Sequence, residues 1–180
     1  RGSWVVELSA VLRWPQDSWC PRCGPGTASA PPSFSITVTS LLVVQNDWDK
    51  PIGRIGNALV GNGAMLDVRM SSHELPPVDG YDGLIVLPGL ADPGDDDPAV
   101  HRTLALLEEA VGRGVPVLGL CLGGQLLAHA LGGETYRSED ERGYREIWAT
   151  EAAAHDPLLG GAPSRFEAFH AHAYAFLPPA

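Results

Sequence analysis

Short hydrophobic runs alternate with amphipathic segments along most of the chain, and this alternation predicts strands separated by helices. Residues 40–45 read SLLVVQ, and residues 84–87 form a second continuous hydrophobic run between a glycine and a proline. Continuous runs of this length are typical of strands that are covered on both faces, as in a parallel sheet. We therefore predict a buried strand at each of these places, and a further short strand at residues 64–69.

The segments between these runs carry the signals of helices. Pro51 can occupy the first turn of a helix that ends at the glycine-rich residues 61–63. Asp97 and Pro98 supply an N-cap and a first-turn proline for a longer helix, which ends at the glycines of residues 112–114. The buried face of this longer helix is expected to consist of hydrophobic residues at helical spacing, namely Val100, Leu104, Leu107 and Val111.

The pattern changes after a fourth hydrophobic run. Residues 115–120 form this run, and a helix-like segment at residues 126–131 follows it. Beyond Gly132 the chain contains only short extended pieces, near residues 134–137, 146–150 and 166–169. Alternating strands and helices with short connections favour a parallel sheet with helices on both faces. We therefore predict an α/β fold with a doubly wound, flavodoxin-like, mostly parallel sheet and an antiparallel extension.

The first part of the chain has a different character. Residues 1–37 show neither strand nor helix periodicity and contain five prolines. We expect a disordered or non-native leader there, and one domain over residues 38–180. Cys20 and Cys23 lie in this leader with the C-x-x-C spacing of half a zinc site or of a redox pair. Because no second cysteine pair or suitable histidine pair follows, we interpret them as an incidental pair and expect no bound metal.

Composition and charge narrow the class of protein. The 180 residues include 44% hydrophobic and 19% charged residues, as is ordinary for one soluble globular domain. The formal net charge of −10 argues against nucleic acid and an anionic membrane surface as partners, because phosphate binding requires clustered Lys and Arg. No hydrophobic run approaches the roughly 20 residues of a membrane span. A reactive thiol favours the reducing cytoplasm as the location.

The candidate chemistry centres on Cys121, the middle residue of G-L-C-L-G at residues 119–123. This pattern is typical of a nucleophile elbow, a sharp strand-to-helix turn that leaves almost no space for side chains two positions before and after its tip. Gly119 and Gly123 meet that requirement. We expect the turn to expose the thiol and to direct helix N–H groups at it, which favours the thiolate. The alternative, that Cys121 is merely a small buried hydrophobic residue, does not explain Gly119 and Gly123.

The predicted topology also suggests which residues lie around Cys121. In open α/β sheets, ligands bind beyond the carboxyl ends of the strands, where the winding reverses. The carboxyl ends of three predicted strands would face one crevice there, and Gly89 would lie beside Cys121. The backbone N–H groups of Gly89 and Leu122 could then hold an oxyanion.

Together these segments resemble the class I glutamine amidotransferases, specifically the GMP-synthase-like members that carry the glutaminase domain alone. The resemblance covers about residues 38–179 and is carried by residues 81–87, 95–98, 114–128 and 156–159. It implies that Cys121 attacks the side-chain carboxamide of glutamine, that ammonia leaves, and that water frees glutamate from a γ-glutamyl thioester. It also implies that Gly89 and Leu122 stabilise the oxyanion, that Gln125 helps to bind glutamine, and that no cofactor is required.

The last part of the chain both resembles the family and departs from it. Residues 169–174 read FHAHAY, where the family commonly has Phe-His-Trp-His-Gly-Asp beside bound glutamine. The resemblance therefore places His172, Ala173 and Tyr174 in the substrate pocket. Alanine stands at 171 instead of tryptophan, and residues 88–90 read PGL where two glycines and a proline are common.

A further departure concerns the catalytic base. The family takes its histidine and the carboxylate partner from a later motif, and no His-x-Glu occurs in this sequence. We therefore expect either a C-terminally incomplete domain or one whose activity is lost or altered. His170 and His172 are the alternative candidates for a base, since any histidine within reach with a suitable pKa can serve.

We predict a glutamine amidotransferase that passes ammonia to a separate synthase or ammonia-accepting subunit, or releases it. A γ-glutamyl peptide hydrolase on the same fold stays open, as does a catalytically inactive binding or regulatory module. An acidic cluster is expected to form a solvated loop, because its spacing lacks the glycine and terminal glutamate of a calcium loop. This cluster consists of Asp92, Asp95, Asp96 and Asp97.

Overall fold

The structure is a computed structural model that describes residues 38–155, 159 and 161–177. The predicted leader, with Cys20 and Cys23, lies outside these residues, and so does most of the segment 156–159. The expectations for the leader and for the limits of the domain therefore stay predictions.

Four parallel strands form the central sheet. They are β1 (Ser40–Gln45), β2 (Met65–Met70), β3 (Gly83–Val86) and β4 (Val117–Gly119). Their order across the sheet is β2-β1-β3-β4, and every neighbouring pair is parallel. This is the order of a flavodoxin-like sheet, in which the winding reverses between β1 and β3. The predicted fold class is confirmed.

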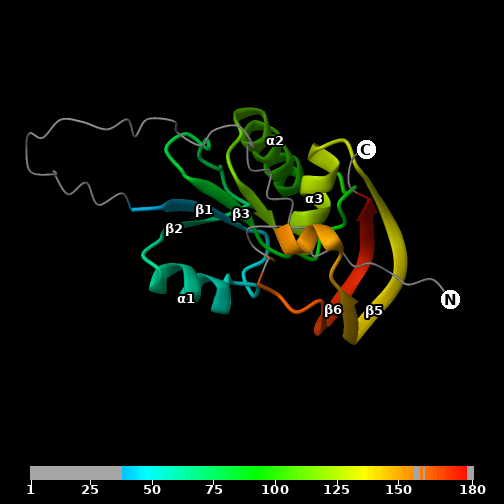
Figure 1. Ribbon diagram of the computed structural model, residues 1–180. Helices are drawn as coiled ribbons and strands as arrows, with labels where there is room; N and C mark the ends of the chain where they lie inside the picture. The colour runs from blue at the N-terminus through cyan, green and yellow to red at the C-terminus, as the bar shows by residue number, and fades with distance from the viewer. Residues whose placement is uncertain (1–37, 156–158, 160, 178–180) are drawn as a thin grey trace, which may run out of the picture.

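Helices cover both faces of this sheet (Figure 1). α1 (Gly53–Gly61) lies on one face, and α2 (Pro98–Arg113) and α3 (Leu122–Ala130) lie on the other. α1 begins after Pro51, which lies outside the helix, and α3 begins directly after Cys121, earlier than the predicted 126–131. None of the described helices is long and hydrophobic enough to cross a membrane.

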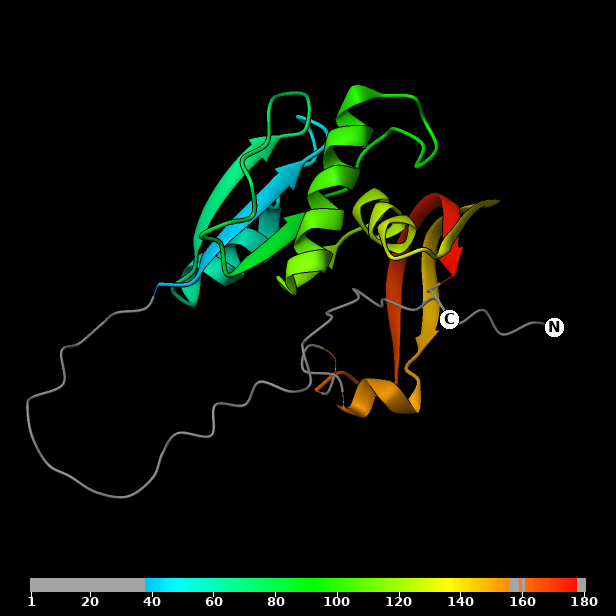
Figure 2. The same ribbon diagram turned by 90° about the horizontal axis from the view of Figure 1, so that it is seen from above.

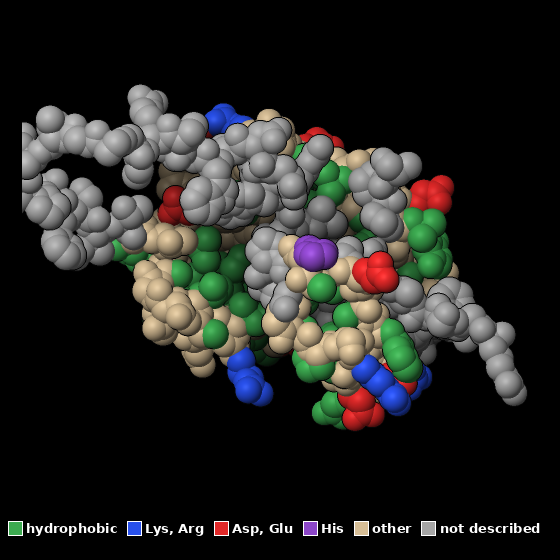
Figure 3. All heavy atoms as spheres, viewed as in Figure 1, with side chains coloured by type: hydrophobic (Ala, Val, Ile, Leu, Met, Phe, Trp, Pro, Cys, Tyr) green, Lys and Arg blue, Asp and Glu red, His purple; other side chains and the backbone are tan. Residues whose placement is uncertain are grey.

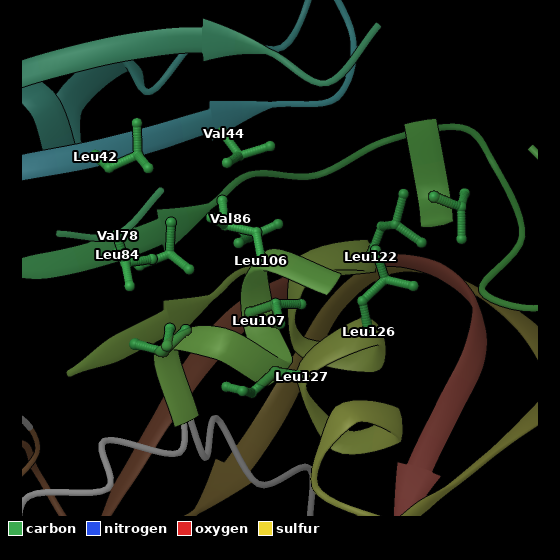
Figure 4. Packing of buried hydrophobic residues seen from close by; sticks show 13 residues of the cluster. Leu42, Val44, Val78, Leu84, Val86, Leu106, Leu107, Leu122, Leu126 and Leu127 are labelled. Carbon is green, nitrogen blue, oxygen red and sulfur yellow. The ribbon is translucent and has the colours of Figure 1, made fainter. Parts of the chain in front are cut away.

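The alternation of side chains along β1 explains why its run is continuously hydrophobic. Leu42 and Val44 pack with the α2 and α3 side of the core, whereas Val43 packs on the opposite side with α1. Successive residues of a strand point to opposite faces, so a strand covered on both faces needs hydrophobic residues at every position. Figure 4 shows the cluster on the α2 and α3 side, in which Leu42 and Val44 lie together with Leu122 and Leu126 of α3.

The limits of α2 agree with the prediction, but its buried face does not. The side chain of Asp97 accepts a hydrogen bond from the Ala99 N–H at 2.7 Å, and Gly114 ends the helix in the left-handed conformation with φ 71°. The buried residues are Val100, Thr103, Leu106, Leu107 and Ala110, whereas Leu104 and Val111 are partly buried. The face differs from the expectation because it includes small and polar residues. Thr103 can be buried since its hydroxyl donates to the Ala99 carbonyl.

The predicted antiparallel extension is a hairpin of two long strands. β5 (Glu134–Trp148) pairs with β6 (Arg165–Leu177), and a short 3-10 helix, η1 (Glu151–His155), lies between them. The sequence predicts three short pieces instead, because β5 is rich in charged residues and neither strand shows one regular pattern over its whole length. Figure 2 shows the hairpin beyond α3, apart from the parallel sheet. Both strands contact α3, so the hairpin reaches the helix that follows Cys121.

One face of the hairpin is exposed and mixes aromatic with charged side chains. Tyr144 packs edge-on against Phe169, with ring centroids 5.5 Å apart, and both residues are exposed. Arg165 lies over the ring of Trp148 and pairs with Glu146. Figure 3 shows hydrophobic side chains and charges of both signs side by side at the lower end of the hairpin. Such cross-strand pairs stabilise the pairing of the two strands.

Candidate active site

Cys121 lies at the junction of β4 and α3, and its backbone has φ 53° and ψ −115°. It is the only non-glycine residue with a positive φ in the described part of the chain. A side chain makes this conformation costly by about 1 to 3 kcal/mol, so the surrounding structure has to enforce it. The sharp turn that the sequence predicts at this position is present.

Two glycines allow this turn to close. A Cβ atom on Gly119 would lie 2.5 Å from the Gly123 carbonyl oxygen, and a Cβ atom on Gly123 would lie 2.2 Å from the Val86 carbonyl oxygen. Both distances are far below van der Waals contact, and both neighbours are backbone atoms that no rotamer change can move. The lack of space therefore requires glycine two positions before and two positions after Cys121, as in a nucleophile elbow.

The surroundings of the thiol act on its pKa in opposite directions. Cys121 is exposed, yet protein atoms crowd its sulfur, and this desolvation is the largest influence. A hydrogen bond from the Leu122 N–H and the positive charge of Lys50 both favour the thiolate, but they are smaller, so the pKa of Cys121 is raised. The first N–H of the helix thus favours the thiolate, as expected, but desolvation outweighs it. The next N–H groups of α3 are already bound to the Leu120 and Cys121 carbonyls.

The raised pKa predicts how alkylation of Cys121 depends on pH. The thiolate is the reacting form, so a pKa above the ordinary value of 9.0 keeps most of the thiol protonated at neutral pH. The rate of iodoacetamide labelling should still be rising steeply at about pH 10, where a reference peptide thiol approaches its plateau. Lys50→Met should shift the profile further upward, because it removes a charge that favours the thiolate. A wild-type plateau below pH 8 would contradict the assignment.

Gly89 lies against the elbow. A Cβ atom at this position would lie 2.5 Å from Leu122 Cδ2 and 2.9 Å from Asn46 Cβ. The φ of Gly89 is not positive, so close approach and not backbone conformation requires the glycine. In the structure, Gly89 thus lies next to Leu122. These are the two residues that the sequence analysis predicted as oxyanion donors.

Two polar side chains that follow β1 hold the segment around Gly89, and the sequence analysis missed them. Asn46 Nδ2 donates to the Leu87 carbonyl at 2.7 Å, and the Leu90 N–H donates to Asp47 Oδ2 at 2.6 Å. The available signal was the position of Asn46 and Asp47, directly after a buried strand at the edge where the crevice was expected. The segment they bind follows β3, which lies next to β1 as in the predicted flavodoxin-like order, but the individual hydrogen-bond partners are not visible in the sequence.

Gln125 is buried in α3 next to β6. Its side chain is 6% exposed, and its Nε2 donates to the Tyr174 carbonyl at 3.0 Å. This hydrogen bond uses one of the two N–H groups of the amide and holds β6 beside α3. Its position four residues after Cys121 brings β6 close to the elbow.

The three residues predicted to line the substrate pocket lie on β6. His172, Ala173 and Tyr174 are all partly buried. His172 Nε2 lies 3.3 Å from Nδ1 of the buried His170. The Tyr174 hydroxyl donates to Asp92 Oδ2 at 2.8 Å, and this hydrogen bond raises the pKa of Tyr174. Tyr174 thus connects β6 with the segment that follows β3.

The acidic cluster is engaged in local hydrogen bonds. The Asp92 N–H donates to Asp95 Oδ2 at 2.8 Å, the Asp95 N–H donates to the Asp92 carbonyl, and Asp97 caps α2. Among the described residues, no three His, Cys, Asp or Glu side chains form a group that could hold a metal ion.

Comparison with known proteins identifies related sequences. The family model for glutamine amidotransferase class-I matches residues 52–179. One subunit of the glutamine-hydrolysing GMP synthase from Halobacterium salinarum is 32% identical over 146 residues, which are 78% of this chain and 72% of that protein. The GMP synthase of Aeropyrum pernix is 48% identical over 67 residues, which are 37% of this chain and only 12% of that protein.

Solved structures agree in fold. A glutamine amidotransferase from Methylobacillus flagellatus superposes with a TM-score of 0.71 and 32% identity, over 79% of this chain and 59% of that chain. One from Thermotoga maritima has a TM-score of 0.72 and 22% identity, over 79% of this chain and 64% of that chain. The chain therefore spans somewhat less than two thirds of these structural relatives.

Proposed function

This chain belongs to the class-I glutamine amidotransferase family, and from this premise we propose that its Cys121 thiol hydrolyses the side-chain amide of glutamine. The observation that carries the proposal is the strained backbone of Cys121 between two glycines that only an elbow requires. Strain of this kind persists where function uses the residue it presents. The exposed thiol at the carboxyl edge of a doubly wound sheet lies where ligands of such sheets bind.

The proposed reaction has two stages. A base takes the thiol proton, the sulfur bonds to the carboxamide carbon, and the carbonyl electron pair moves onto oxygen. When this intermediate collapses, the C–N bond breaks, and the nitrogen takes up a proton and leaves as ammonia. Water then attacks the γ-glutamyl thioester, the C–S bond breaks, and glutamate and the thiol are released.

Two backbone groups are proposed to stabilise the oxyanion. The Leu122 N–H already points at the sulfur of Cys121, and an oxyanion formed next to the sulfur would lie within its reach. The Gly89 backbone lies against the Leu122 side chain, so it can supply a second donor from the opposite side. Preorganised N–H donors of this kind typically contribute the largest share of transition-state stabilisation in acyl transfer.

Because the pKa of Cys121 is raised, the proposed reaction requires a separate group that removes the thiol proton. In the described part of the chain, the influences on the pKa of Cys121 are burial, the Leu122 N–H and Lys50, and none of them can accept the proton. Turnover of glutamine therefore depends on a base that reaches the thiol. Trapping of the thiolate by an electrophile at elevated pH has no such requirement and tests recognition and oxyanion stabilisation directly.

We propose that β6 forms one wall of the glutamine site through His172, Ala173 and Tyr174. Gln125 then contributes indirectly, because its amide holds the Tyr174 carbonyl and so fixes this wall beside the elbow. Ala171 stands where the family resemblance places a tryptophan, which would leave more space next to the substrate. This difference favours a γ-glutamyl peptide as the second candidate substrate.

The relatives suggest what could use the ammonia. One relative is named as one of the subunits of GMP synthase, and another, from Hypocrea virens, as the small chain of a carbamoyl phosphate synthase with 35% identity over 80 residues. We propose that this chain likewise supplies ammonia to a separate synthase. Its thiol nucleophile fits the reducing cytoplasm, which we propose as its location.

The proposal is tested by covalent trapping of the full chain. Cys20→Ser and Cys23→Ser leave Cys121 as the only thiol, and intact mass then follows its reaction with the chloroketone analogue of glutamine at pH 9. We expect much faster labelling than with chloroacetone, which has the same reactive group but no amino-acid part. Glutamine should protect the thiol, and Cys121→Ala should not be labelled.

Other outcomes separate the alternatives. Protection by a γ-glutamyl peptide, but not by glutamine, would identify a γ-glutamyl peptide hydrolase. Equal rates with the two chloroketones, without protection by either ligand, would overturn the proposal and indicate a module that does not recognise a γ-glutamyl group.

A further inference from the structure

The segment that carries Gly89 is held along the end of β1. Within this 87–95 loop, the Leu87 N–H donates to the Val44 carbonyl at 2.9 Å, and the Leu87 carbonyl accepts from Asn46. Three residues later, the Leu90 N–H donates to the Asp47 carboxylate at 2.6 Å. Gly89 therefore lies between two fixed points, and its neighbour on the other side is Leu122.

A glycine between fixed points still leaves its peptide groups a choice of orientation. Glycine adopts both signs of φ at little cost, so the peptides on either side of Gly89 can flip unless something holds them. In a trans peptide, the N–H of Leu90 and the carbonyl of Gly89 point in opposite directions. The Asp47 carboxylate attracts the N–H and would repel the carbonyl, so it selects one of the two orientations of the 89–90 peptide. Because this peptide is fixed on one side and Leu87 is fixed on the other, the intervening peptide that carries the Gly89 N–H is confined as well.

We propose that Asp47 is a positioning residue, whose carboxylate holds the Leu90 N–H and thereby keeps the Gly89 N–H directed at the oxyanion next to Cys121. This inference rests on the proposed function, because it assumes that Gly89 is an oxyanion donor. Asp47 itself touches neither the substrate nor the thiol. It acts only through the backbone of the 87–95 loop.

A second contact supports the far end of the same loop. The Tyr174 hydroxyl donates to Asp92 Oδ2, and Tyr174 is itself held through its carbonyl by Gln125. Asp92 also accepts the Asp95 N–H at its carbonyl, which closes a turn. The loop is thus held by β1 at one end and by β6 at the other, with Gly89 nearer to the Asp47 end.

Asp47 also lies close to the positive charge of Lys50, and this charge offers a competing explanation for any effect of an Asp47 variant on Cys121. Lys50 Nζ lies 3.8 Å from Asp47 Oδ2 and 3.0 Å from Asp49 Oδ1, and its charge acts on Cys121. A variant of Asp47 could therefore change the thiol through Lys50 and not through the loop. Asp49 is the matched control, because it makes the shorter contact with Lys50 and none of the described hydrogen bonds to the loop.

The test compares two reagents on the full chain in which Cys121 is the only thiol. Attack on the carbonyl of chloroacetone produces an oxyanion, whereas iodoacetamide reacts by direct displacement at a saturated carbon. The ratio of the two rate constants, measured at one pH, therefore reports oxyanion stabilisation and cancels changes in the pKa of the thiol. Neither reagent requires recognition of glutamine.

Asp47→Ala should lower this ratio by about tenfold or more, since loss of one oxyanion donor costs roughly 100-fold or more in comparable sites. Asp47→Asn should retain most of the ratio, because its amide oxygen can accept the same hydrogen bond. Asp49→Ala should leave the ratio unchanged. If Asp47→Ala does not fold, Asp47→Glu takes its place, because it keeps the charge but displaces the acceptor by one methylene.

An unchanged ratio in Asp47→Ala would overturn the inference, and so would equal losses in Asp47→Ala and Asp47→Asn, or in Asp47→Ala and Asp49→Ala. Failure of the proposed function is recognised separately. In that case the chloroketone analogue of glutamine shows no advantage over chloroacetone, whatever the effect of Asp47.

Discussion

Replacing Cys121 with glycine is expected to abolish labelling by every thiol reagent and, at the same time, to stabilise the fold. The wild-type residue has φ 53° and ψ −115°, a region that glycine occupies without a steric penalty. Relief of this strain should raise the free energy of unfolding by about 1 to 2 kcal/mol. For a chain of this size, that corresponds to an increase in Tm of roughly 3 to 6 °C. Thermal unfolding followed by circular dichroism measures this change.

Cys121→Ala is the matched control for this prediction. It removes the thiol as completely as glycine does, but it keeps a Cβ atom and therefore keeps the strain. Its Tm should not exceed that of the wild type, because it keeps the strain and also loses the contacts of the sulfur atom. If the glycine and alanine variants had the same Tm, the positive φ of Cys121 would not be a source of strain. The claim that the turn at Cys121 is strained would then be wrong.

The difference between these variants links the local geometry with the proposed chemistry. A thiol with a raised pKa is not stabilised as an anion by its surroundings, so the strain does not serve to ionise it. The turn determines where the sulfur lies, beside the Leu122 N–H. Under the proposed function, the strained turn lowers the stability of the fold but fixes the position of the Cys121 sulfur.

The features that could be predicted from the sequence depend on residues close together in the chain. Leu42, Val43 and Val44 are all fully buried, and only a strand covered on both faces gives such a continuous run. The elbow could be predicted for the same reason, because both glycines and the cysteine lie within five consecutive positions. Each of these patterns has one physical cause, and that cause acts locally.

The features that were missed depend on contacts between distant segments. The Asp47 hydrogen bond joins residues 43 positions apart, and the Gln125 bond to Tyr174 joins residues 49 apart. The net direction of the pKa shift at Cys121 was missed for a related reason. The helix N–H that favours the thiolate is visible in the sequence, whereas the crowding of the sulfur arises only in the folded chain.

The second large effect is expected at Gly123. An alanine there would place its Cβ 2.2 Å from the Val86 carbonyl oxygen and 2.9 Å from the Val86 Cβ, and the backbone of β3 cannot move aside without separating from its neighbouring strands. We expect Gly123→Ala to lower the free energy of unfolding by about 3 kcal/mol or more. This corresponds to a loss of roughly 6 °C or more in Tm.

The neighbouring glycine provides a control with the opposite expected sign. A Cβ on Gly124 would lie 3.4 Å from the Gly119 carbonyl oxygen and 3.6 Å from a ring carbon of Phe176, which is ordinary contact. Alanine also favours the helical conformation over glycine by about 0.5 to 1 kcal/mol, so Gly124→Ala should be neutral or stabilising. Similar Tm values for the two variants would contradict the assignment. A difference of the expected sign would show that α3 is pressed against β3 at one residue, the residue that gives the turn at Cys121 its shape.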